Sequence, residues 1–171
     1  MLDTLISEFS PNTDMPIGII ALRILGALLL CGAIGFEREQ RDRPAGLRTH
    51  MLVGLASAVY CILTLELMAQ GGDTVDTARY DPIRVIEAVT SGVAFLAAGM
   101  IVFSQGKVRG LTTGASLWLV AAVGVACGLG LWDVAVLTAI PALIVIRLVG
   151  RMEKRWSGEA DPAETPGRPE R

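Results

Sequence analysis

The chain has 171 residues, of which 52% are hydrophobic, and its formal net charge is −2. Its mean hydropathy is +0.53, a value that soluble domains of this size rarely reach because their surfaces must be polar. The small negative charge argues against nucleic acid as a partner. Composition and charge therefore predict a protein whose main partner is the lipid bilayer.

Five apolar segments have about the length that a membrane-spanning helix needs, which is roughly 20 residues. In chain order they are Ile17–Phe36, Leu47–Met68, Ile83–Phe103, Leu111–Leu131 and Trp132–Val149. The fifth is the shortest and contains Pro141, where we expect a kink. The predicted fold class is an all-α membrane protein with five transmembrane helices.

The segments outside these helices complete the predicted organisation. Residues 1–16 form a short periplasmic segment, residues 17–149 the five-helix transmembrane domain, and residues 150–171 a cytoplasmic tail. The tail is rich in proline, glycine and charge, which predicts disorder. The first fifteen residues contain no Lys or Arg, so they lack the basic region of a signal peptide, and we expect the first helix to remain in the mature protein.

Basic residues near the helix ends predict the orientation, because cytoplasmic loops of membrane proteins carry the excess of Lys and Arg. The clusters follow the first, third and fifth helices. Their members are Arg38, Arg41, Arg43 and Arg48, then Lys107 and Arg109, then Arg147, Arg151, Lys154 and Arg155. The N-terminus is therefore predicted outside and the C-terminus inside.

A shift of 64 residues places the first helix pair on the second without a gap. Gly46 then falls on Gly110, Leu47 on Leu111 and Thr49 on Thr113; these three matches share the pattern Gly-Leu-x-Thr. Both pairs run out–in–out, so helices one and two would form a parallel repeat with helices three and four. The alternative is a convergent helix start, with glycine for the turn and threonine for the cap.

Three charged residues lie inside the predicted membrane segments: Arg23, Glu66 and Glu87. A charge in the bilayer core is costly, so each should face the bundle interior with a partner. We expect Arg23 to pair with Glu87, with Glu66 as the alternative acceptor. Two interpretations stay open, an ion or proton site at the repeat interface and a structural ion pair that fixes the helix register.

The run Glu37–His50, EREQRDRPAGLRTH, lies between two membrane-length segments. We expect residues 37–42 to extend the first helix, with i,i+4 pairs of Glu37 with Arg41 and of Arg38 with Asp42, until Pro44 ends the helix. The simplest interpretation is a solvated helix end that cancels its own charge. His50 is interpreted as a polar residue at the membrane boundary and not as a ligand.

The two Gly-Leu-x-Thr helix starts, at Gly46 and Gly110, suggest a binding site on the cytoplasmic side. Helix N-termini attract anions, and basic residues surround both starts. We expect a phosphate, a nucleotide or a lipid headgroup between the two turns. The basic residues concerned are Arg43, Arg48, Lys107 and Arg109.

Two blocks carry a resemblance to a known family. The block Gly32–Ala58, GAIGFEREQRDRPAGLRTHMLVGLASA, resembles a signature of the MgtC/SapB family of bacterial inner-membrane proteins, and the block Ser91–Gly130 resembles a second one. The first motif comprises Glu37, Arg38, Glu39, Pro44, Gly46, Leu47, Arg48 and Thr49. The second comprises Gly110, Leu111, Thr112, Thr113, Ser116 and Trp118.

Some positions depart from the family pattern, and the resemblance covers only part of the longer members. Ala97 stands where the family usually has Gly, and Thr112 stands where some members have Asn. Arg23 fits an arginine that is common in the family's first helix. The resemblance extends from Leu22 to Trp132, the membrane domain, with no counterpart of the C-terminal cytoplasmic domain that longer members carry.

The resemblance implies a multi-pass protein of the bacterial inner membrane that is linked to magnesium limitation and, in pathogens, to virulence. It implies a regulatory protein whose partners include other membrane proteins, with the F-type ATP synthase as the named candidate. The alternative is a small magnesium or proton transporter or channel with its site near Arg23 and Glu87. Glycine pairs such as Gly124-x-x-x-Gly128 allow close helix packing, within the chain or in a homodimer.

Other chemistry finds little support in the sequence. No Cys–His, Ser–His or metal-ligand spacing is present, so we expect no enzyme. Magnesium is the candidate ion, and an acidic stretch, Asp73, Asp76 and Asp81, could bind a divalent cation weakly. Cys31, Cys61 and Cys127 all lie in apolar segments and are expected to be unpaired thiols.

Overall fold

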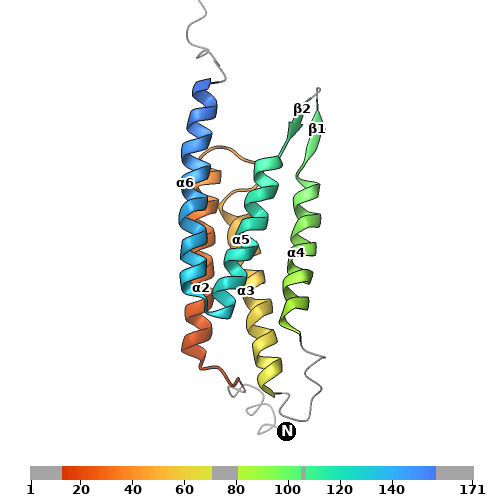
Figure 1. Ribbon diagram of the computed structural model, residues 1–171, viewed down its shortest axis with the longest axis vertical. Coiled ribbons are helices and arrows are strands. Elements are labelled where there is room, and N and C mark those ends of the chain that lie inside the picture. The colour runs from red at the N-terminus through yellow and green to blue at the C-terminus, as the bar shows by residue number, and fades with distance from the viewer. Residues whose placement is uncertain (1–12, 71–80, 105–106, 157–171) are drawn as a thin grey trace, which may run out of the picture.

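The computed structural model describes residues 13–70, 81–104 and 107–156 of the chain. Five helices and one short hairpin make up this part (Figure 1). The helices are α2 (Ile17–Glu39), α3 (Leu47–Gln70), α4 (Pro82–Gly99), α5 (Leu111–Leu129) and α6 (Trp132–Trp156). The hairpin pairs β1 (Val102–Ser104) with β2 (Lys107–Arg109) in antiparallel register, Val102 opposite Arg109.

The helices lie side by side along the long axis of the molecule and alternate in direction (Figure 1). The α2–α3 connection, residues 40–46, and the β1–β2 hairpin lie at the same end of the bundle, which we call the loop end. The starts of α2 and α4 lie at the opposite end. The two turns that the sequence analysis singled out are therefore neighbours in the fold.

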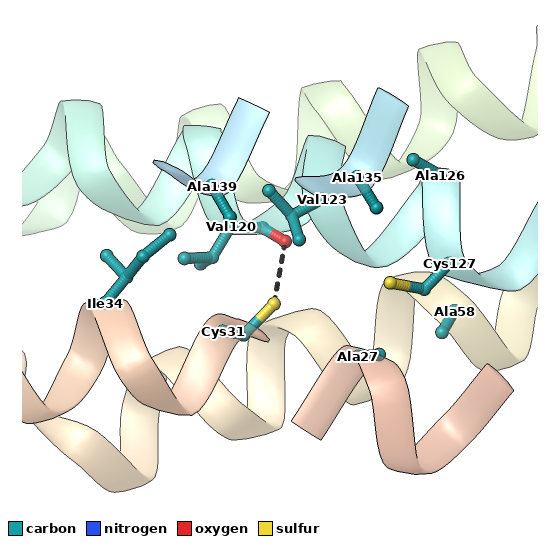
Figure 2. Packing of buried hydrophobic residues seen from close by; sticks show 10 residues of the cluster. All are labelled: Ala27, Cys31, Ile34, Ala58, Val120, Val123, Ala126, Cys127, Ala135 and Ala139. Atoms are coloured by element: carbon teal, nitrogen blue, oxygen red, sulfur yellow. Dashed lines mark hydrogen bonds between the residues drawn. The ribbon is translucent and has the colours of Figure 1, made fainter. Parts of the chain in front are cut away.

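Helix α5 forms the centre of the bundle and contacts each of the other four helices. In its most apolar 18-residue stretch 61% of the residues are buried, against 6% in α4. Figure 2 shows the core around α5, which consists mainly of small side chains from α2, α3, α5 and α6. The Cys31 thiol donates a hydrogen bond to the carbonyl oxygen of Val120 at 3.4 Å within this core.

Glycines set the distance between α3 and α5. A Cβ on Gly124 would collide with the backbone of Gly54, and a Cβ on Gly128 would collide with the backbone of Ala58. Because neither glycine has a side chain, the two helix backbones approach closely enough to touch. The Gly124-x-x-x-Gly128 pair therefore packs within the chain.

Four helices of the described part are long and apolar enough to cross a membrane: α2, α3, α4 and α5. The fifth predicted span, α6, is not among them, and it continues through Pro141. Large apolar side chains cover the outer surface, with Phe95 exposed by 85% and Leu29 by 72%. Such a surface suits a lipid environment, because a soluble protein would expose polar groups in these places.

Two predicted boundaries are wrong. The third span was expected to reach Phe103, but α4 ends at Gly99 and Val102 and Phe103 belong to β1. These residues continue the apolar run, yet β-branched and aromatic side chains also suit a strand. Helix α6 continues to Trp156, so the first residues of the predicted tail are helical. The tail beyond them and residues 1–12 lie outside the described residues.

Candidate functional site

The two signature blocks meet at the loop end, where the last turn of α2 lies against the first turns of α3 and α5. Five polar or charged residues from these turns are buried there: Glu37, Arg38, His50, Thr113 and Ser116. Both helices begin as predicted, α3 at Leu47 and α5 at Leu111, each directly after a glycine. We call these five residues the loop-end polar cluster.

His50 is the centre of this cluster and is fully buried, with 0% exposure. Its Nδ1 lies 2.8 Å from the carbonyl oxygen of Gly46, and its Nε2 lies 3.0 Å from Oγ of Ser116. Because a carbonyl only accepts, Nδ1 carries a proton. The imidazole therefore connects the start of α3 to α5, a buried contact that the interpretation of His50 as a polar boundary residue did not include.

The Ser116 hydroxyl links the protonation of His50 to the hydrogen bonding of α5. Its Oγ lies 2.8 Å from the carbonyl oxygen of Thr113, which can also accept its single proton. If the hydroxyl donates to Thr113, Nε2 of His50 must donate to Ser116, and the imidazole is charged. If the hydroxyl donates to His50, the imidazole is neutral. One proton thus decides between two hydrogen-bond patterns at this contact.

Arg38 connects the first motif to the second. Its side chain is 3% exposed, and Nη2 lies 3.5 Å from Oγ1 of Thr113. Its Nε makes no hydrogen bond. The neighbouring Glu37 is 2% exposed, and its Oε1 lies 2.6 Å from Nε of Arg41. This is the predicted Glu37–Arg41 pair, whereas Oε2 of Glu37 has no hydrogen-bond partner.

The predicted extension of the first helix to residue 42 is wrong, and so is the pairing of Arg38 with Asp42. Helix α2 ends at Glu39, and Asp42 adopts a left-handed conformation with φ 48°. The backbone N–H of Arg43 donates to the carbonyl oxygen of Arg38 at 3.2 Å, which is the six-residue bond of a Schellman cap. This cap turns the chain before Pro44 is reached.

The start of α3, one of the two helix starts predicted to attract an anion, is capped by a carboxylate of the chain itself. Oε2 of Glu39 accepts the backbone N–H of Leu47 at 2.9 Å. A Cβ on Gly46 would collide with this carboxylate, so the glycine makes room for the cap. Arg43 and Arg48 are exposed, as is Arg109 at the end of β2. One N–H group at the start of α3 is therefore already capped, and an anion site between the two turns stays a prediction.

The second motif divides between buried and exposed residues. Gly110 precedes α5 with φ +89°, a conformation that favours glycine, and a Cβ there would meet the carbonyl of Met100. Thr113 and Ser116 face the bundle, while Leu111 and Trp118 are more than half exposed. Thr112 is also exposed, and in the first motif Pro44 is exposed while Thr49 is half-buried. In both motifs, therefore, only some of the residues face the bundle and make contacts there, while the others lie on the outer surface.

The charges inside the membrane segments do not pair with one another. Arg23 donates from Nη1 to the carbonyl oxygen of Gly128 at 2.8 Å, beside the left-handed cap residue Gly130. Glu66 is buried and accepts the backbone N–H groups of Asp14 and Met15, at 2.8 and 2.9 Å. The predicted pair of Arg23 with Glu87 or Glu66 is therefore corrected, because backbone groups satisfy both side chains.

Glu87 lies on the exposed side of α4 and forms no ion pair with any described residue. Among the described residues no group of three His, Cys, Asp or Glu side chains could hold a metal ion. Asp81 caps α4 by accepting the N–H of Ile83 at 2.9 Å. Asp73 and Asp76 lie outside the described residues.

Comparison with known proteins agrees with the two signature blocks. A family model described as MgtC family matches residues 24–155. A relative from Escherichia coli (strain K12), named "Putative magnesium transporter YhiD", is 35% identical over 134 residues, which are 78% of this chain and 62% of the relative. No solved structure matches.

Two further relatives carry the name "Protein MgtC". The protein from Brucella abortus (strain 2308) is 45% identical over 117 residues, covering 68% of this chain and 45% of the relative. The protein from Salmonella typhimurium (strain 14028s / SGSC 2262) is 40% identical over 125 residues, covering 73% and 48%. The chain thus spans about half the length of these relatives. It belongs to the MgtC family and is a multi-pass membrane protein.

Proposed function

We propose that this protein acts in magnesium homeostasis as a regulatory protein of the bacterial inner membrane, with its N-terminus outside and its C-terminus inside. The magnesium link is supported by family membership and by the relative that is named a putative magnesium transporter. The protein works by binding other membrane proteins and is not an enzyme. The F-type ATP synthase is the first candidate partner. In a pathogen, control of this partner would support survival in the host, as the resemblance to the family implies.

One observation carries the choice of regulation over transport. The ion site was predicted near Arg23 and Glu87, but Glu87 is exposed and Arg23 donates to a backbone carbonyl of its own chain. Glu66, the alternative acceptor for Arg23, also binds backbone groups. Arg23 holds the end of α5, and Glu66 holds the residues that precede α2. A charge that holds backbone groups in place serves the fixed structure of the bundle, whereas a transport site must release its contacts when an ion passes.

Growth at limiting magnesium tests the role in magnesium homeostasis and the choice of regulation over transport. A bacterial strain lacking its own copy of the gene should grow poorly in medium of low magnesium, and the wild-type chain should restore growth. Glu87→Gln should restore growth equally well, because Glu87 is exposed and holds no other described residue. Loss of growth with this variant, at an unchanged amount of protein in the membrane, would instead support the transporter with a site near Arg23 and Glu87.

A partner can be identified in the same strains. Cross-linking in intact cells, followed by mass spectrometry, should recover one other membrane protein in fixed proportion to the chain at low magnesium and less of it at high magnesium. A subunit of the F-type ATP synthase is the first candidate. Recovery of the chain alone, or of a homodimer whose amount does not change with magnesium, would contradict a regulatory role through a partner.

A further inference from the structure

An apolar groove lies between α3 and α4. It has a volume of about 710 Å³. It opens because α4 packs mainly against α5 and leaves α3 largely uncovered along this side. Ser57, Tyr60 and Thr64 of α3 line one wall, and Arg84, Val89 and Gly92 of α4 line the other. None of the loop-end polar cluster lines this groove.

Two hydroxyl groups on the α3 wall already donate hydrogen bonds within the helix. The Ser57 hydroxyl donates to the carbonyl oxygen of Val53 at 2.8 Å, and the Thr64 hydroxyl donates to that of Tyr60 at 2.8 Å. The hydroxyl protons of Ser57 and Thr64 are thus used inside the helix, and apart from the Tyr60 phenol the wall presents mainly carbon to the groove. A ligand that lies along this wall should be a hydrocarbon.

One mouth of the groove carries a positive charge. Arg84 lies in the first turn of α4, at the end of the bundle opposite to the loop end, and its side chain is exposed. It forms neither an ion pair nor a side-chain hydrogen bond with any of the described residues. Asp81, which is close in sequence, is occupied as the cap of α4. A guanidinium at the edge of a membrane binds phosphate groups well.

The size of the groove distinguishes a lipid chain from a helix. From Val53 to Leu67 the α3 wall is about 21 Å long at 1.5 Å per residue, so it is longer than one leaflet of about 15 Å and shorter than a bilayer core of about 30 Å. A membrane-spanning helix, which needs about 30 Å, would extend well beyond this wall, whereas an acyl chain of one leaflet fits within its length.

We propose that the groove between α3 and α4 binds one anionic phospholipid, with an acyl chain along α3 and the phosphate at Arg84. The charge at the mouth selects the headgroup, and the self-satisfied wall holds the chain. The bound lipid fills the space that α4 leaves beside α3 and thereby holds these two helices in a fixed relation. This inference does not depend on the proposed function.

The test uses the purified full-length protein and the substitution Gly92→Leu. A Cβ on Gly92 meets no atom within 4 Å, so a side chain added there projects into the groove and narrows it. Gly18→Leu is the matched control, because Gly18 is equally free of contacts but lies in α2, away from the groove. Native mass spectrometry in mild detergent counts the phospholipids that each protein keeps after reconstitution in vesicles of phosphatidylglycerol and phosphatidylcholine and re-extraction.

Wild-type protein and Gly18→Leu should keep one phospholipid per chain and prefer phosphatidylglycerol, whereas Gly92→Leu should keep neither lipid. Arg84→Gln should keep a lipid but lose about fivefold of its preference for phosphatidylglycerol. Arg48→Gln, at an exposed arginine of the loop end, should behave as wild type. Equal lipid retention by Gly92→Leu and Gly18→Leu would overturn the proposal. So would a dimer that Gly92→Leu converts to a monomer without any change in bound lipid, since the groove would then be an interface between two copies.

Discussion

At the scale of the residue, the environment of His50 in the structure differs from the one that its neighbours in the sequence suggest. In the sequence it follows a run of charges and precedes an apolar segment, which suggests the membrane boundary. In the structure it is enclosed between the Gly46 carbonyl and Ser116, and it joins the two signature blocks. Sequence spacing could not reveal this contact, because Ser116 lies 66 residues away.

His50→Ala should therefore destabilise the protein. The substitution removes the two hydrogen bonds of the imidazole, each of which contributes about 0.5–1.5 kcal/mol, and the cavity left by the ring adds to this loss. Arg48→Ala is the control. Arg48 lies two residues before His50 and is exposed, so its substitution should change the free energy of unfolding by less than about 0.5 kcal/mol. The free energy of unfolding, measured by denaturant titration in mixed micelles, should separate the two variants. Equal values would contradict the role given to His50.

At the scale of the element, the contact between α3 and α5 depends on the absence of side chains. Gly124 and Gly128 let the backbone of α5 touch that of α3, and α5 contacts all four other helices at the centre of the bundle. A glycine inside a helix is otherwise unfavourable by about 1 kcal/mol relative to alanine. The close packing must therefore compensate this loss at several positions.

Alanine substitutions should consequently have opposite effects in α5 and α4. Gly124→Ala places a methyl group against the backbone of Gly54 and should destabilise the protein by about 1–3 kcal/mol, as overpacking does. Gly92→Ala meets no atom within 4 Å and should stabilise it by up to about 1 kcal/mol through helix propensity. Unfolding of both variants under the conditions used for His50→Ala gives the comparison. A stabilising Gly124→Ala would refute the close contact.

Helix starts were predictable from the sequence, and the partners of buried charges were not. The predicted starts at Ile17, Leu47, Leu111 and Trp132 agree with the structure, because a polar, glycine or proline break precedes each apolar run. The end of α4 was missed because Val102 and Phe103 prolong its apolar run into the hairpin. The partner of Arg23 was not predictable, because a sequence pattern suggests oppositely charged side chains as partners, whereas the acceptor is the backbone carbonyl of Gly128.

At the scale of the whole molecule, the bundle separates its polar contacts from its apolar surface. The loop-end polar cluster unites the signature residues of α2, α3 and α5, while Arg23 and Glu66 tie helices together nearer the other end. Between them lies a core of small apolar side chains around α5 (Figure 2). The parallel repeat stays a prediction: α3 and α5 start alike, but a turn precedes one and a hairpin the other.

The central claim is that this protein serves magnesium homeostasis without moving magnesium itself. Its most direct test is the flux of Mg²⁺ into liposomes that contain the purified chain and an enclosed magnesium-sensitive dye, with and without a proton gradient. A known magnesium channel in the same liposomes serves as the positive control. We expect the rate of entry to equal that of protein-free liposomes under both conditions. Entry above that rate, reduced by Glu87→Gln, would contradict the claim and identify a transporter.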